Sequence, residues 1–173
     1  MAKAFQSMEL YPELAPVQRA WRAIRSEALA AVPAMISLCD PRANPDTWSV
    51  LPMLPEPKGR RIISAGLSAS ARQVTPLTKA LVKRVPGARG FAFSRLAAGA
   101  GIKLHRHSNP FVTGALTLVS DGAAAIEVSG VRHPFVEGRF VIFDYRLTHS
   151  VLNSGRVYRI VLLVLLDNRD RHD

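Results

Sequence analysis

The chain has 173 residues, of which 48% are apolar and 21% charged; this fits one folded domain and excludes a disordered or low-complexity protein. Its net charge at pH 7 is +10. The single cysteine, Cys39, excludes an internal disulfide and a cysteine-based zinc site.

The first predicted element is an amphipathic helix near residues 16–31. Its apolar residues recur at spacings of three and four and are Leu14, Val17, Trp21, Ile24 and Ala28. Pro16 suits the first turn of such a helix, and Pro33 prevents its continuation. A proline-rich connection, Pro41–Pro57, follows and contains Trp48.

A second helix is predicted to begin at Thr75, as N-cap, with Pro76 in the first helical position. Pro86 ends it. Its expected buried face consists of Leu77, Leu81 and Val85.

From Gly90 onward the sequence consists of short apolar runs separated by Gly, Asn, Asp and Pro, which is typical of strands. The predicted strands are 91–96, 102–107, 114–119, 124–128, 140–143, 149–152 and 157–166. Asp121-Gly122 and Asn153-Ser154-Gly155 are predicted hairpin turns. The run Ile160–Leu166 is apolar on both faces and predicts a central strand. Helices followed by many short strands indicate an α+β fold with a β-dominated sandwich or barrel.

No segment predicts export or a membrane anchor. The longest apolar run, Ile160–Leu166, is far shorter than the ~20 residues that span a bilayer. Residues Met1–Tyr11 lack the apolar region of a signal peptide. We therefore expect a cytoplasmic protein with no membrane partner.

The excess positive charge lies in residues 57–120, which hold eleven Lys or Arg and no Asp or Glu, whereas the remainder holds twelve basic and thirteen acidic residues. Such a stretch can attract an anionic partner or form an ordinary solvated surface. Aromatic residues among these charges are few and no nucleic-acid-binding motif is present, so we expect no nucleic-acid partner.

Three histidines are candidate metal ligands. His105 and His107 are two residues apart in a predicted strand, so their side chains share one face. His149 begins a later strand, after the turn 144–148. Three protein ligands from two strands leave coordination positions open for small molecules. The alternative is a polar strand face, because His105 and His107 have Lys103 and Arg106 as neighbours in the sequence.

Arg159 is a candidate anion-binding residue because it lies within the apolar segment 157–164. A buried guanidinium without a counter-charge is costly. A carboxylate ligand could satisfy it through the planar donor fork. A structural ion pair with Asp144 or Glu127 is the alternative.

Several motifs together point to a known family. The segment Gly90-Phe-Ala-Phe-Ser94 leads into a glycine-containing turn and then to His105, and Phe135–Asp144 leads to His149. Arg159 stands ten residues beyond His149. With residues 11–25 as an opening helix, the chain resembles, over nearly its whole length, the aspartyl/asparaginyl β-hydroxylase family of iron(II)- and 2-oxoglutarate-dependent oxygenases.

The resemblance implies a double-stranded β-helix (jelly-roll, cupin-like) with N-terminal flanking helices. It implies one oxygenase domain, 1–173, with a helical part at about 1–88 and a jelly-roll core at about 89–168.

It further implies that His105 and His149 ligate the iron and that Arg159 and Ser94 hold the distal carboxylate of 2-oxoglutarate. Trp48 matches an aromatic residue near the cosubstrate pocket. The alternative roles are a strand hydroxyl bonded to backbone for Ser94 and a core anchor for Trp48.

The chain departs from the family pattern at two places. His107 stands where this family typically has glycine, so it is either a third ligand or turned away from the metal. Thr113 and Ala115 stand where the family has an arginine and a histidine that contact the reactive end of 2-oxoglutarate. Arg95 or Arg106 could compensate for that loss.

The sequence therefore predicts a non-haem Fe(II)- and 2-oxoglutarate-dependent oxygenase that uses O2. It would hydroxylate an unactivated C–H bond of an amino acid, a peptide or another small soluble substrate and release succinate and CO2. One alternative is a three-histidine cupin-type dioxygenase that does not use 2-oxoglutarate. The other is a catalytically inactive β-barrel that binds an anionic partner through residues 57–120.

Overall fold

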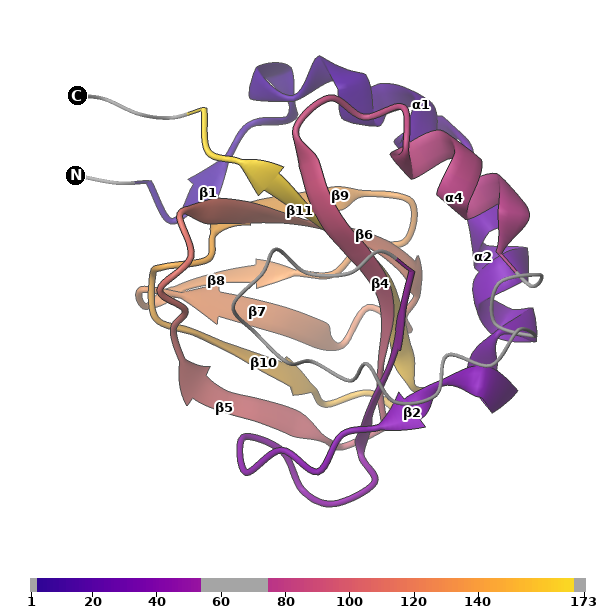
Figure 1. The fold of residues 1–173 in the computed structure, drawn as a ribbon. Helices are drawn as coiled ribbons and strands as arrows, with labels where there is room; N and C mark the ends of the chain where they lie inside the picture. The colour runs from indigo at the N-terminus through magenta and orange to yellow at the C-terminus, as the bar shows by residue number, and fades with distance from the viewer. Residues whose placement is uncertain (1–2, 54–74, 170–173) are drawn as a thin grey trace.

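The computed structural model describes residues 3–53 and 75–169. The strands are β1 (Phe5–Gln6), β2 (Ile36–Ser37), β3 (Trp48–Pro52), β4 (Ala88–Leu96), β5 (Gly101–His105), β6 (Phe111–Val119), β7 (Ala124–Val128), β8 (Val131–Pro134), β9 (Phe140–Asp144), β10 (His149–Asn153) and β11 (Arg159–Asp167). They form a seven-stranded sheet, β1-β9-β6-β11-β4-β3-β2, and a four-stranded sheet, β5-β10-β7-β8 (Figure 1). Two antiparallel sheets enclosing one interior confirm the predicted β-dominated jelly-roll.

All seven predicted strands are present, and β11 is central, between β6 and β4, as its two apolar faces predict. Four further strands were not predicted: β1, β2, β3 and β8. Of these, β3 lies inside the proline-rich connection, whose last residues, 54–57, lie outside the described residues. The strand β8 returns along β7 across a turn at Ser129-Gly130, where both residues have positive φ.

Two predicted hairpin turns instead connect the two sheets. Asp121-Gly122 joins β6 to β7, and Asn153–Gly155 joins β10 to β11, so in each case the flanking strands belong to different sheets. The two connections bind each other, because the Asp121 carboxylate accepts a hydrogen bond from the Arg156 backbone N–H at 2.7 Å. A turn sequence predicts a chain reversal but not which strands pair afterwards, which is why the hairpin prediction is wrong.

The predicted first helix is two helices, α1 (Ala15–Arg19) and α2 (Trp21–Ala30). They are separated at Ala20, whose ψ of 9° interrupts the α-helical backbone. The short 3-10 helices are η1 (Met8–Leu10), η2 (Pro12–Leu14) and η3 (Val32–Ala34). The predicted apolar face is confirmed at Leu14, Val17, Ile24 and Ala28, which are buried, and Trp21 is half-buried.

The second helix, α4 (Pro76–Val82), begins where predicted but is capped differently. The Thr75 side chain makes no capping hydrogen bond. Instead, the Glu27 carboxylate of α2 accepts hydrogen bonds from the backbone N–H groups of Leu77 and Thr78 and from the Thr78 hydroxyl. The buried residues of α4 are Thr78 and Val82. Leu77 is 38% exposed, so the prediction that it is buried is wrong.

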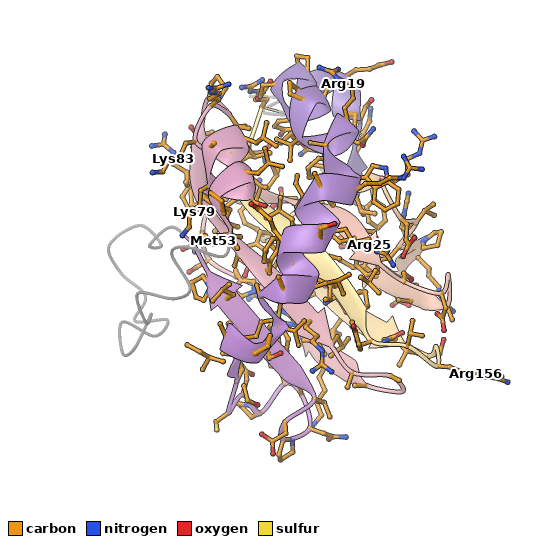
Figure 2. All side chains as sticks on the ribbon, turned by 90° about the vertical axis from the view of Figure 1, so that its right-hand side faces the viewer. Arg19, Arg25, Met53, Lys79, Lys83 and Arg156 are labelled. Atoms are coloured by element: carbon orange, nitrogen blue, oxygen red, sulfur yellow. The ribbon has the colours of Figure 1, made fainter. Side chains whose placement is uncertain are left out.

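The helices cover the outer face of the seven-stranded sheet (Figures 1 and 2). Apolar side chains from α1, α2, β4, β6 and β11 form one continuous core there. Lys79 and Lys83, labelled in Figure 2, lie on and just after α4, and Lys79 is half-buried while Lys83 is exposed. They belong to the basic stretch, of which residues 57–74 lie outside the described residues.

Within the described part of the chain, the helices are all too short or too polar to cross a bilayer.

Candidate metal centre

His105 and His149 stand opposite each other on neighbouring strands of the four-stranded sheet. His105 ends β5, His149 begins β10, and the two are register partners with ring centroids 4.3 Å apart. The Nδ1 atom of His105 lies 2.7 Å from the Lys103 carbonyl oxygen, and that of His149 lies 2.8 Å from the Leu147 carbonyl oxygen. A carbonyl oxygen only accepts hydrogen bonds, so Nδ1 carries the proton in both rings. Nε2 is therefore the atom that each ring can offer to a metal.

His107 joins these two rings from a loop. The strand β5 ends at His105, so the predicted strand through His107 is too long. The His107 backbone N–H donates to the Tyr145 carbonyl oxygen at 3.2 Å. Its ring stacks on the Tyr145 ring with centroids 3.6 Å apart and planes 7° apart. Sequence analysis did not identify Tyr145; its position in the turn before His149 was the available signal.

The three histidines form one donor set. One ring nitrogen from each lies within 4.8 Å of the other two. His107 and His149 are buried, and His105 is half-buried. Three imidazoles at this spacing fit a divalent first-row metal and leave coordination positions open. Among the described residues this is the single cluster of three or more metal-binding side chains.

Burial keeps His149 in the form that can bind a metal. Desolvation is the main cause that lowers the pKa of His149 to about 4, and the charges of His105 and Arg42 add to it. The ring is therefore neutral at pH 7. A neutral imidazole has the nitrogen lone pair that coordination requires.

Arg159 is buried at the start of β11 without a counter-ion among the described residues. Its exposed fraction is 3%, and its Nε has no hydrogen-bond partner in the described part of the chain. The alternative of an ion pair with Asp144 or Glu127 is wrong, because Asp144 pairs with Arg146 at 2.7 Å and Glu127 is exposed. Burial lowers the pKa of Arg159 to about 10, so the guanidinium is still charged at pH 7.

Ser94 connects Arg159 to Trp48. The Ser94 Oγ accepts a hydrogen bond from Trp48 Nε1 at 3.0 Å and a long one from Arg159 Nη2 at 3.4 Å. Ser94 is therefore bonded to side chains, and the alternative of a purely backbone-bonded hydroxyl is wrong. Trp48 also packs beside buried Leu96 and Ile102, so it combines a polar contact with an anchoring one.

One cavity of about 1090 Å³ joins these groups. The three histidines, Arg159, Ser94 and Trp48 all line it, so the structure brings together every predicted site residue. Two further charged side chains, Asp40 and Arg42, line it as a mutual ion pair that sequence analysis did not identify.

Thr113 and Ala115 are the positions at which the chain lacks the family's arginine and histidine. Thr113 and Ala115 line the cavity, whereas Arg95 and Arg106 do not. Arg95 instead lies over the Tyr158 ring at 4.7 Å. The proposed compensation by Arg95 or Arg106 is therefore wrong, and among the described residues Arg42 and Arg159 are the cavity's only Lys or Arg side chains.

The sequence matches the family model for aspartyl/asparaginyl β-hydroxylases over residues 18–168. The chain belongs to this family. Membership confirms the resemblance seen in the motifs around His105, His149 and Arg159. A comparison with curated proteins found no match.

Solved structures similar to this aspartyl/asparaginyl β-hydroxylase family member share its fold. A prolyl-4-hydroxylase from Pseudomonas putida has 19% identity and a TM-score of 0.53, with 88% of each chain covered. A predicted oxalate decarboxylase from Thermotoga maritima has 18% identity and a TM-score of 0.51, covering 78% of this chain and 92% of its own. The same jelly-roll scaffold therefore occurs in proteins of different names, and function depends on the side chains of the site.

Proposed function

We propose that this protein is a non-haem Fe(II)- and 2-oxoglutarate-dependent oxygenase that hydroxylates an unactivated C–H bond and releases succinate and CO2. The observation that carries the proposal is one cavity that contains both a histidine donor set and a buried arginine without a counter-ion among the described residues. Membership in a hydroxylase family supports it.

The residues present fit the iron and the cosubstrate. His105 and His149 would hold the metal through Nε2, with His107 as a candidate third ligand. When bound, iron with 2-oxoglutarate supplies the oxidising chemistry that inserts an oxygen atom from O2 into a C–H bond. The protein contributes orientation, charge and exclusion of water.

Arg159 would bind the far carboxylate of 2-oxoglutarate. Its Nε has no partner among the described residues, and its Nη2 makes only a 3.4 Å contact with Ser94. A carboxylate would give this guanidinium two short charge-assisted hydrogen bonds. A dicarboxylate is suited to this role, because one carboxylate would neutralise Arg159 and leave the other end for the metal in the same cavity.

Ser94 would assist Arg159. Its oxygen already accepts hydrogen bonds from Trp48 and Arg159, so its own proton is available to a carboxylate oxygen. Trp48 fixes the position of the Ser94 hydroxyl and covers this end of the cavity. Arg159 and Ser94 would thus present donors to an anion, and Trp48, whose Nε1 already donates to Ser94, would help exclude water around it.

A three-histidine dioxygenase that does not use 2-oxoglutarate is the second candidate. The observation that favours it is the approach of the His107 ring to within metal-ligand spacing of His105 and His149. In this candidate the substrate itself would occupy the open coordination positions.

Oxygen consumption after anaerobic reconstitution with Fe(II) separates the two candidates. We expect consumption to require 2-oxoglutarate and to yield succinate. Consumption that is equal without 2-oxoglutarate would support the second candidate instead. In parallel, His107→Gly restores the typical family residue; retained succinate formation in this variant indicates a two-histidine centre, and its loss indicates three ligands.

A further inference from the structure

The inner face of the seven-stranded sheet has a floor of small residues beneath the cavity. On β4 the residues that face inward are Gly90, Ala92 and Ser94, and all three line the cavity. Ala92 is aligned across the sheet with Leu163 of β11, which is aligned with Ala115 of β6. Small residues on both sides of Leu163 leave space above the sheet that side chains would otherwise fill.

The few charged side chains that line the cavity each have a proposed ligand or an ion-pair partner. Arg159 would bind the cosubstrate, and the three histidines would bind the metal. Asp40 and Arg42 neutralise each other through a bidentate pair, and Arg42 also lies over the Trp48 ring at 5.4 Å. Among the described lining residues, no charged side chain is left to recognise a carboxylate or an ammonium group of a substrate.

One hydroxyl stands apart within this apolar lining. Thr113 is 2% exposed, and its Oγ1 has no hydrogen-bond partner among the described residues. It lines the cavity on β6, aligned with Phe143 of β9. Phe143 in turn contacts the His149 ring, with centroids 5.1 Å apart. A buried hydroxyl in this position points to a ligand with one neutral polar group near the metal centre.

The size of the cavity leaves room for a second molecule. Its volume of about 1090 Å³ is at the upper end of the roughly 300–1,000 Å³ that ligand pockets usually have. A small dicarboxylate between the histidines and Arg159 would occupy only part of it. The remainder is bounded by Val50, Pro52, Met53, Ala92, Leu163 and Leu165.

We propose that the part of the substrate that enters this cavity is uncharged and mainly aliphatic, and that Thr113 makes its single hydrogen bond. This inference rests on the proposed oxygenase function, which places the cosubstrate at Arg159. The expected substrate was an amino acid, a peptide or another small soluble molecule. The proposal narrows this class to molecules that present an apolar chain with one neutral polar group, such as an amide or an ester.

Calorimetric titration of the protein, loaded anaerobically with Fe(II) and 2-oxoglutarate, tests the proposal with four probes. They are butanamide, hexanamide, octanamide and, as the charged probe, the α-amide of N-acetyl-L-aspartic acid, which keeps a free β-carboxylate. Without O2 the readout is binding alone. We expect affinity to rise about two- to fourfold per methylene and octanamide to bind tighter than the charged probe. Equal affinity from butanamide to octanamide, or tighter binding of the charged aspartic acid derivative, would overturn the proposal.

Two variants locate the binding. Ala92→Leu fills the floor and should weaken octanamide binding at least tenfold, whereas Ala80→Leu on the exposed side of α4 is the matched control. Thr113→Val should weaken all three amides by a similar factor of about five to tenfold, and Thr113→Ser should restore their binding. Unchanged octanamide binding in Ala92→Leu, or no loss in Thr113→Val, would contradict the assignment.

The same probes separate this proposal from the oxygenase function. Chain-length-dependent amide binding together with no 2-oxoglutarate turnover under O2 supports the apolar site and counts against the oxygenase. Turnover of 2-oxoglutarate together with equal binding of all amides supports the oxygenase and overturns the apolar site.

Discussion

The two faces of the seven-stranded sheet use the same strands in different ways. On β11, Ile160, Leu162 and Val164 point toward the helices and are fully buried. Their neighbours Arg159, Leu163 and Leu165 point inward and line the cavity. On β4, likewise, Phe93 belongs to the core beneath the helices, while Ala92 and Ser94 border the cavity.

Alternate residues of the same strands therefore contribute to the packed core on one face and to the candidate site on the other. The helix side is filled with large apolar side chains, so its contribution is burial. The cavity side combines apolar residues with small and polar ones, so part of this face borders a cavity instead of packed side chains. Substitutions on one face should therefore change unfolding, and substitutions on the other should change binding.

The strongest test of the cavity side is removal of a candidate metal ligand. His149→Ala should abolish iron binding and succinate formation, because it deletes one of two opposed donors. Iron content after anaerobic reconstitution and succinate formation are the measurements. His133→Ala, on β8 and outside the donor set, should keep both. Full turnover in the His149 variant would contradict the assignment of this centre.

A matched pair on β11 tests the difference between the faces directly. Leu162→Ala should lower the free energy of unfolding by about 2–5 kcal/mol, because the residue is fully buried in the core beneath the helices. Leu163→Ala should cost about 1 kcal/mol or less, because its side chain already borders a cavity. Urea unfolding measures both. Equal losses in the two variants would mean that the inner face is packed as tightly as the outer one.

Arg159→Met should weaken 2-oxoglutarate binding without lowering the free energy of unfolding. Loss of charge-assisted hydrogen bonds worth about 1.5–3 kcal/mol predicts roughly tenfold to hundredfold weaker 2-oxoglutarate binding. The free energy of unfolding without ligand should stay equal or rise, because a buried charge with no counter-ion among the described residues is removed. Arg95→Met, which lies over Tyr158 outside the cavity, is the control. Unchanged 2-oxoglutarate affinity in the Arg159 variant would count against the carboxylate site.

A smaller effect than that of Leu162→Ala is expected from a polar contact on the helix side. Glu27→Ala removes the carboxylate that caps α4 through three hydrogen bonds. It should lower the free energy of unfolding by about 1–2 kcal/mol and leave iron and 2-oxoglutarate binding unchanged. Thermal unfolding compared with Glu9→Ala, an exposed residue, checks the first point. A loss of ligand binding in Glu27→Ala would show that the two faces are coupled.

The sequence predicted strands well where both faces or alternate faces are apolar. The segments around β6, β7 and β11 carry that pattern, and all three are present. It missed β3, because the short run beginning at Trp48 stands in a proline-rich segment. That strand forms because β4 offers it a partner, aligning Trp48 with Leu96 and Val50 with Ser94.

The sequence indicated the candidate metal-binding and anion-binding residues, but not the residues that pack against them or share the cavity. Motif spacing pointed to His105, His149 and Arg159, and the cavity contains all three. Tyr145, which stacks on His107, and the Asp40–Arg42 pair had no comparable signal. Their roles depend on contacts between segments that the sequence places far apart or in loops.

The strand periodicity, the starts of the helices and the types of the candidate ligand-binding side chains follow from neighbours along the chain, so they could be predicted from the sequence. Three features could not. His107 reaches the other two imidazoles from a loop, Asp144 pairs with Arg146 and not with Arg159, and small residues on adjacent strands border a cavity. Those outcomes depend on which strands become neighbours, and strand pairing is fixed by the burial of the whole chain.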